Sequence, residues 1–333
     1  MAIAGGEPLI YPHIVEVVNF ISKRNMKPVL LTNGEKLTKE FAVELKKAGL
    51  AKFHFHVDSG QERNGWTGKN EKEMNDLRQH YADLIWDLGG IQCGFNVTVY
   101  RSTLGYLPDI IHWCFENIHK VQHISLIAFR AIPLVDKIRI MAGRENIDPC
   151  RLHNVEDMLE EINITSEEMF ETVEKKHPTF RPCAYLGGTT APESYKYLVA
   201  VNVGSRRKRY GFLGAKTVEL VQIFYHFFLH RYCSFLRNPK AGKKLFILSL
   251  WDRELRRAFA HFLKDLVKNP LLIFAKIYTQ TIHFQQPNEI LNGQVNLCDG
   301  CANMMVHEGK LINSCRLDEY RMFGQPVTVV MEE

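Results

Sequence analysis

The sequence lacks the long apolar run that a membrane-spanning helix needs. No window of its 333 residues reaches the roughly 18 to 20 uninterrupted apolar positions required, because its most apolar stretch, 217–236, is broken by polar and charged side chains. Low-complexity tracts and internal repeats are also absent, and 46% of the residues are hydrophobic against 24% charged. This composition is typical of an ordered globular protein with one large core or two smaller ones.

A signal peptide of the usual type is not recognisable, and disulfides are not expected. Eight cysteines in such a chain favour a reducing, cytoplasmic compartment, where thiols are kept for packing or for metals. Cys93, Cys114 and Cys233 lie in apolar surroundings typical of core residues, so they receive no functional role.

The first 135 residues alternate short apolar runs, such as 27–32 and 52–57, with amphipathic stretches. This rhythm predicts parallel strands joined by crossover helices, either closed into a barrel or left open, with ligands at the carboxyl ends of the strands. The run Met1–Ala4 enters a Gly-Gly turn at once. We therefore expect the chain to begin on a buried strand, with a preceding segment missing from the sequence.

The first strand end carries the motif Gly5-Gly6-Glu7-Pro8. Two glycines let the backbone approach a ligand closely, and the carboxylate can accept hydrogen bonds from an ammonium group. A plain strand-to-helix turn with a capping Glu is the alternative for an isolated motif of this kind.

The series of strand ends resembles the radical S-adenosylmethionine (SAM) superfamily, whose second barrel strand ends in GGEP. Segments 30–34, 55–60, 95–99 and 127–132 resemble the third to sixth strands of that family. The resemblance implies a partial (β/α)6 barrel in which Glu7 holds the amino group of SAM, while catalytic residues stay unassigned. The SAM-binding residues it implies are Gly5, Gly6, Glu7, Pro8, Asn33, Ser59 and Asn96.

One element of the family pattern is absent from this sequence. The C-x-x-x-C-x-x-C loop that binds the catalytic [4Fe–4S] cluster in the family precedes GGEP, and no such triplet occurs here. The favoured explanation is that the sequence starts at an internal methionine of a longer protein, so that this chain alone is inactive. A degenerate relative without radical chemistry is the alternative.

A second group of candidate ligands lies near the C-terminus, where Cys298, Cys301 and Cys315 form a C-x2-C-x13-C pattern. A C-x-x-C turn brings two thiolates to one metal, and a returning strand can deliver the third. Unbound thiols, or a zinc site completed by His307, Cys183 or Cys150, remain open alternatives. The spacing is similar to that of the twitch/SPASM group, which implies an auxiliary [4Fe–4S] cluster with Cys183 as a candidate fourth ligand.

The middle of the chain combines aromatic and basic residues. Between Ser205 and Lys244 ten Lys or Arg residues face one acid, Glu219, and aromatic side chains crowd 224–235. The favoured interpretation is a helical core that covers the barrel mouth. A surface that meets anionic lipid is the main alternative, and binding of a single nucleic-acid strand is less favoured.

Three sections follow from these patterns: a partial radical SAM barrel over 1–135, a helical substrate- or membrane-facing region over 136–290, and an auxiliary-cluster module over 291–333. The architecture resembles tetraether-lipid-synthase-like enzymes, which implies hydrogen abstraction from an unactivated C–H bond of a lipid. The alternatives are a peptide- or cofactor-maturing enzyme and a non-catalytic barrel with a zinc tail. The resemblance also implies a reductant such as ferredoxin or flavodoxin, and a cytoplasmic location with peripheral contact at the inner membrane surface.

Overall fold

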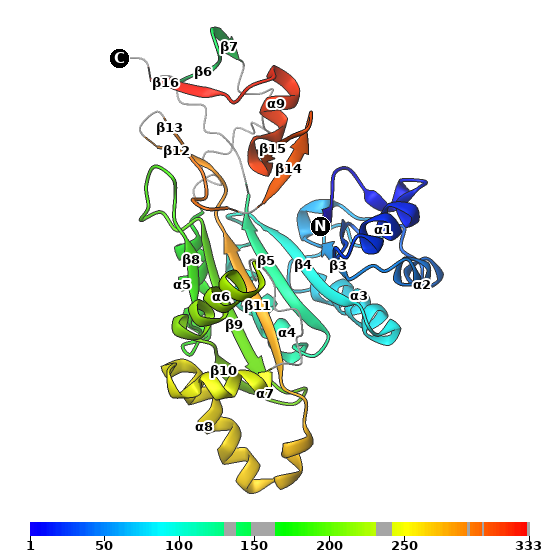
Figure 1. Cartoon of the computed structure of the whole chain (residues 1–333), viewed down its shortest axis with the longest axis vertical. Coiled ribbons are helices and arrows are strands. Elements are labelled where there is room, and N and C mark those ends of the chain that lie inside the picture. The colour runs from blue at the N-terminus through cyan, green and yellow to red at the C-terminus, as the bar shows by residue number, and fades with distance from the viewer. Residues whose placement is uncertain (130–137, 148–163, 231–241, 292–293, 302, 332–333) are drawn as a thin grey trace.

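The protein has a mixed α/β fold built on one nine-stranded sheet, which the computed structural model shows in Figure 1. The structure describes residues 1–129, 138–147, 164–230, 242–291, 294–301 and 303–331. The strand order is β1-β2-β3-β4-β5-β11-β9-β10, with β8 paired to β9. Neighbouring strands from β1 to β11 run parallel, so the predicted α/β class with a mostly parallel sheet is confirmed.

The N-terminal part alternates strands and helices as the apolar rhythm predicts. Its strands are β1 (Ala2–Ile3), β2 (Val29–Thr32), β3 (Lys52–His56), β4 (Gln92–Val99) and β5 (Val121–Ala128). Its helices are α1 (Ile14–Lys23), α2 (Lys39–Lys47), α3 (Met74–Leu88) and α4 (Leu107–Glu116), with short 3-10 helices η1 (Pro8–Ile10), η2 (Ser59–Gln61) and η3 (Leu104–Tyr106).

Local sequence signals explain where these helices begin and which face they bury. The Thr38 side chain caps α2 by accepting a hydrogen bond from the Phe41 amide at 3.1 Å. In α1, Ile14, Val18 and Ile21 recur at helical spacing and are buried against the sheet. The helices therefore form because their apolar stripes have a sheet face to cover.

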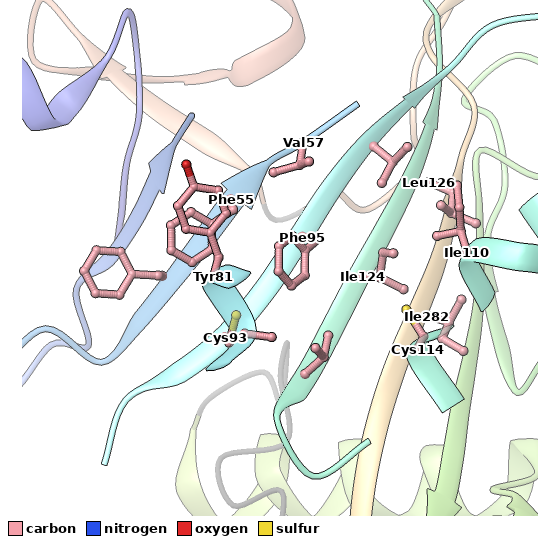
Figure 2. Close-up of a cluster of buried hydrophobic side chains, with 14 of the residues drawn as sticks. Phe55, Val57, Tyr81, Cys93, Phe95, Ile110, Cys114, Ile124, Leu126 and Ile282 are labelled. Carbon is pink, nitrogen blue, oxygen red and sulfur yellow. The ribbon is translucent and has the colours of Figure 1, made fainter. Parts of the chain in front are cut away.

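The main core lies between the sheet and helices α1 to α5. On β3, Phe53 and Phe55 point toward the helices, and the Phe55 ring stacks on Tyr81 of α3 with centroids 4.4 Å apart. Figure 2 shows Phe55, Tyr81 and Phe95 beside one another in this layer. Each buried aromatic side chain contributes roughly 1.5–3 kcal/mol relative to an exposed one. Because strand side chains alternate, the residues between these phenylalanines face the other side of the sheet.

The region predicted as helical, 136–290, also supplies strands to the same sheet. Strand β11 (Tyr278–Gln285) lies parallel to β5 and antiparallel to β9 (Tyr197–Gly204), with Thr281 opposite His123. The remaining elements here are α5 (Ser166–Lys176), β8 (Ala184–Leu186) and β10 (Arg209–Phe212). The division at residue 135 therefore does not separate two sheets, because β11 completes the face that β5 begins.

A second core lies under the helices of this region. These are α6 (Ala215–Leu229), α7 (Gly242–Leu245), η6 (Phe246–Leu250), α8 (Arg253–Lys268) and η7 (Pro270–Phe274). Leu255, Ala258 and Phe262 of α8 pack there with Tyr210 of β10 and Phe246 of η6. Within the part of the chain that the structure describes, none of the helices has the length and apolarity needed to cross a membrane.

The C-terminal residues form small antiparallel sheets. These are β12 (Glu289–Leu291) with β13 (Gln294–Asn296), β14 (Met304–His307) with β15 (Lys310–Asn313), and β16 (Thr328–Met331) with β6 (Ile138–Ala142) and β7 (Glu145–Ile147). The 3-10 helix η8 (Ser314–Arg316) and helix α9 (Leu317–Phe323) follow β15. Because β16 pairs with β6, the module predicted over 291–333 shares a sheet with residues 138–147. Figure 1 shows this module at the end of the sheet opposite α8.

The segment that resembles the sixth family strand, 127–132, begins at the carboxyl end of β5. This strand runs from Val121 to Ala128, so residues 127 and 128 of the segment lie on it. Residues 130–132 lie outside the described part.

Candidate functional site

The Gly5-Gly6 turn joins β1 to η1 at the carboxyl edge of the sheet. Gly5 has φ 105° and Gly6 has φ 49°, both in the left-handed region that favours glycine. A Cβ atom at either position would contact nothing within 4 Å, so the space beside this turn is open. The backbone here can therefore be approached by a ligand.

The Glu7 carboxylate links this turn to the end of β2. Its Oε1 accepts hydrogen bonds from the Leu9 amide at 2.9 Å and the Thr32 hydroxyl at 2.5 Å, while Oε2 accepts one from the Asn33 amide at 2.7 Å. A carboxylate offers about four acceptor positions, so about one stays available on Oε2. The sequence placed Glu7 correctly at a strand end but gave no sign of its bonds to Thr32 and Asn33.

Asn33 and Gly34 close the end of β2. The Asn33 side chain accepts a hydrogen bond from the Glu35 amide at 3.0 Å, which shapes the turn. Gly34 has φ 78°, and a Cβ there would lie 2.7 Å from the Tyr81 ring, so both backbone and space require glycine. The strand end is thus rigidly placed beside Glu7.

Arg63 connects the ends of β2 and β3, and sequence reasoning missed it. Its guanidinium is buried and donates to the Asn33 carbonyl at 2.6 Å and to the His56 carbonyl. A buried Arg bonded to two strand-end carbonyls fixes their spacing, because the planar group offers donors in a fixed geometry. Its position in the polar loop Gln61-Glu62-Arg63 carries no recognisable signal.

Asp58 and Ser59 continue the same edge after β3. Burial alone would raise the pKa of Asp58. The hydrogen bond and charge of His56, together with hydrogen bonds from Thr98, outweigh the effect of burial and hold the Asp58 pKa below its usual value. The Ser59 amide donates to Glu71 Oε1 at 2.6 Å. Glu71 forms a buried ion pair with Arg78, so the loop that carries Ser59 is anchored to α3.

Asn96 lies on β4 beside these loops, and its carbonyl accepts a hydrogen bond from the Val57 amide at 3.1 Å. Its side chain forms no hydrogen bond with the described residues. The structure therefore arranges Glu7, Asn33, Ser59 and Asn96 along one edge of neighbouring strands. Only Glu7 and Asn33 are in direct contact.

A cluster of basic side chains lies on the sheet face opposite the phenylalanine layer. The His123 ring lies edge-on to His54 and His283, with centroids 4.9 and 4.5 Å away. Burial lowers the pKa of Lys52 to about 7. Burial, followed by the Lys52 charge, also lowers the pKa of all three imidazoles, in His283 to about 3. Sequence reasoning missed this cluster because its members come from β3, β5 and β11.

The C-terminal cysteines are brought close to Tyr197 of β9. The Cys298 and Cys301 thiols are hydrogen-bonded, which raises the pKa of Cys298 and lowers that of Cys301 to about 6. The Cys315 thiol is near enough to raise the pKa of Cys298 further. Burial raises the pKa of Tyr197, and the three cysteines add to that effect. An isolated antiparallel β-bridge pairs the backbone of Cys298 with that of Gly188.

Cys183 is not brought to this group. Its thiol donates to the Val199 carbonyl at 3.3 Å inside the second core, and burial raises its pKa to about 12. Cys93 and Cys114 are buried in the main core, whereas Cys150 and Cys233 lie outside the described residues. His307 lies on β14 and is partly buried.

Comparisons with known proteins place the N-terminal part in a family. The sequence model of the Radical SAM superfamily matches residues 1–89. The AdoMet-dependent heme synthase of Oleidesulfovibrio alaskensis is 26% identical over 119 residues, which make up 34% of this chain and 29% of that protein. The likeness to this superfamily is carried by residues 1–89. The chain spans less than a third of its heme synthase relative.

Similar solved structures overlap the chain only in part. Streptococcus suis SuiB has a TM-score of 0.35 at 14% identity, over 53% of this chain and 35% of SuiB. Archaeal TYW1 has a TM-score of 0.31 at 11% identity, over 58% of this chain and 53% of TYW1. Scores this low carry no conclusion about function.

The radical SAM residues present fit SAM at the Glu7 edge. The open space beside Gly5 and Gly6 admits a ligand, and the acceptor position left on Glu7 suits an ammonium group. The C-x-x-x-C-x-x-C loop of the radical SAM family does not occur in this sequence, so no residue here is assigned to the catalytic cluster.

The auxiliary cluster predicted from resemblance fits the cysteines in part. Cys298 and Cys301 are paired and Cys315 is nearby, but as placed no three His, Cys, Asp or Glu side chains in the described part of the chain are arranged to hold a metal ion. Cys183 is not a suitable fourth ligand in this arrangement, because its thiol is directed into the core.

Proposed function

We propose that this chain carries the SAM-binding edge of a radical SAM enzyme that removes hydrogen from an unactivated C–H bond. The observation that carries the proposal is the Glu7 carboxylate, fixed by Thr32 and Asn33 beside the open Gly5-Gly6 turn within the matched residues. When bound together with a reduced [4Fe–4S] cluster, SAM supplies the 5′-deoxyadenosyl radical that abstracts hydrogen.

The chain's own residues position SAM. Glu7 accepts a hydrogen bond from its ammonium group, and Asn96 offers a free side-chain amide from the neighbouring strand end. Ser59 extends the same edge, and Arg63 keeps the ends of β2 and β3 at a fixed spacing by bonding both carbonyls. Pro8 starts η1 and fixes the backbone directly after Glu7.

SAM binding to Glu7→Gln and Asn96→Ala tests the assignment. We expect Glu7→Gln to weaken binding about tenfold or more, because it removes a charge-assisted hydrogen bond. Asn96→Ala should weaken it several-fold without structural cost, since that side chain bonds no described residue. Isothermal titration calorimetry measures both, with Glu16→Gln on exposed α1 as the matched control.

Urea unfolding of the same variants separates lost binding from lost folding. Because Glu7 accepts three protein hydrogen bonds, its variant is less stable, whereas Asn96→Ala should unfold like the parent protein. The proposal is contradicted if folded Asn96→Ala and Glu7→Gln variants both keep the parent's affinity for SAM. It is also contradicted if the parent protein does not bind SAM.

We further propose that Cys298, Cys301 and Cys315 hold an auxiliary iron–sulfur cluster. The hydrogen-bonded pair and the low pKa of Cys301 support it, because thiolates are the ligands that such clusters need. Their place at the carboxyl end of the sheet puts the cluster on the same side as Glu7, where it would face the substrate (Figure 1).

Anaerobic reconstitution followed by metal analysis tests the cluster. We expect about four iron and four sulfide ions per chain, lost in Cys298→Ala/Cys301→Ala and kept in the buried-core control Cys93→Ala. Stoichiometric zinc without sulfide would instead support the alternative of a barrel with a structural zinc tail.

The substrate is proposed to be a molecule with an unactivated C–H bond that enters at the carboxyl edge. A peptide or a cofactor precursor is one candidate class here. A lipid is the other. The exposed apolar side chains of α8 and η7 lie at the end of the molecule opposite the Glu7 edge, so they support a docking role more than substrate entry.

A further inference from the structure

The helical end of the molecule exposes a large apolar surface. Val267 near the end of α8 is 84% exposed, and Leu271 and Phe274 of η7 are 73% and 82% exposed. Leu263 of α8 and Ile273 of η7 are exposed as well, and α8 and η7 pack on each other. We call these five residues the apolar patch. Monomeric soluble proteins rarely expose more than a few hundred Å² of contiguous apolar area, so a patch of this kind indicates a partner.

The patch belongs to one packed unit. The inward residues of the same elements, Phe262 and Leu266 of α8 and Leu272 of η7, share the second core. Asp252 caps α8, because its carboxylate accepts a hydrogen bond from the Leu255 amide at 2.9 Å. The exposed residues are therefore presented by elements that are anchored in the second core.

Basic residues lie next to the patch in the chain and remain unpaired. Lys264, Lys268 and Lys276 are exposed and form no ion pair with any described residue. The one acid of residues 263–276, Asp265, is already paired with Lys208. The patch is therefore bordered by unpaired positive charge.

We propose that this surface docks the protein on an anionic lipid bilayer. Exposed aromatic and aliphatic side chains insert at the headgroup boundary, and nearby Lys side chains attract anionic lipid. A second copy is disfavoured, because a two-fold contact would bring the same unpaired basic residues together. Nucleic acid is disfavoured because Val267 and Leu271 offer no ring for base stacking.

The docking surface lies at the amino ends of the parallel strands. Helix η7 leads directly into Tyr278 at the start of β11, whereas the C-terminal module lies beyond Gln285 at its other end. Figure 1 shows α8 and this module at opposite ends of the molecule. Docking would therefore leave the Glu7 edge and the cysteines accessible from the aqueous phase, so this inference is independent of the radical SAM proposal.

Vesicle flotation tests the docking surface. The probes are vesicles of phosphatidylcholine alone and vesicles of equal parts phosphatidylcholine and phosphatidylglycerol, with the full chain. We expect binding only to the anionic vesicles, weakened by added salt. Leu271→Gln/Phe274→Gln and Lys264→Glu/Lys268→Glu should each lower the partition coefficient roughly tenfold or more.

Matched controls carry the same substitutions elsewhere. Phe20→Gln removes an exposed aromatic residue from α1, and Lys36→Glu/Lys39→Glu reverses exposed charges beside α2. These variants should bind like the parent protein, and urea unfolding should show that all variants are folded. Absence of binding to anionic vesicles, or equal losses in patch and control variants, would overturn the proposal. Self-association abolished by the patch variants, with no vesicle binding, would make a second copy the partner.

Discussion

At the scale of single residues, the most consequential charges are those that hold the strand-end loops in place. The Arg78 and Glu71 side chains are 0% and 1% exposed and form an ion pair. Arg78 also donates to the Val57 and Glu71 carbonyls, both at 2.9 Å. Glu71 in turn accepts from the Ser59 amide, so this pair connects α3 to the edge that carries the candidate SAM contacts.

Arg78→Met should destabilise the protein by about 3–5 kcal/mol, because it leaves the buried Glu71 carboxylate without its partner. Urea unfolding measures the loss. Lys69→Met is the matched control, since the Lys69–Glu73 pair is exposed and such pairs contribute about 0–1 kcal/mol. A loss in Arg78→Met no larger than in this control would show that the Arg78–Glu71 pair does not hold the loop. Restored stability in Arg78→Met/Glu71→Leu would identify the unpaired charge as the cause.

At the scale of elements, the sequence predicts what is local and misses what is distant. Each strand of the N-terminal part ends close to its predicted position, because period-2 and period-3.6 patterns report directly on burial. The Gly5-Gly6-Glu7 turn could be predicted for the same reason. The role of Arg63 could not be predicted, because its hydrogen bonds to the carbonyls of Asn33 and His56 form only after β2 and β3 pair.

Strand β11 shows the limit most clearly. It lies about 150 residues beyond β5 in the chain, yet the two pair in parallel from His123 to Ile127. Its sequence, Tyr278–Gln285, contains Thr, Gln and His at positions that face the polar side of the sheet. A search for apolar runs does not detect such a strand, so the sequence predicts a helical region over 136–290. Pairing with β5 and β9 decides its structure.

At the scale of the whole molecule, the basic cluster makes stability depend on pH. Lys52, His54, His123 and His283 come from three strands and meet only in the complete sheet. The folded protein holds all four pKa values below their ordinary ones, chiefly because burial disfavours the charged forms. The unfolded chain therefore binds more protons than the folded one, and stability rises with pH wherever these groups differ.

The Lys52 contribution is best measured between pH 7 and about 8.5, which is below the ordinary pKa of cysteine thiols. Burial raises the pKa of Cys93, Cys114 and Cys183, and these thiols lower the stability at higher pH. The Lys52 pKa is about 7 in the folded protein against an ordinary 10.5, so in this window Lys52 should increase the free energy of unfolding by up to about 1.4 kcal/mol per pH unit. Urea midpoints across this window measure the slope. Lys52→Met keeps the side-chain volume and should flatten the slope of the unfolding free energy against pH. The exposed Lys39→Met substitution should leave that slope unchanged. A slope that survives in Lys52→Met would mean that another group binds the proton. A flat profile in the parent protein would mean that Lys52 stays charged in the fold, with a compensating partner across the sheet.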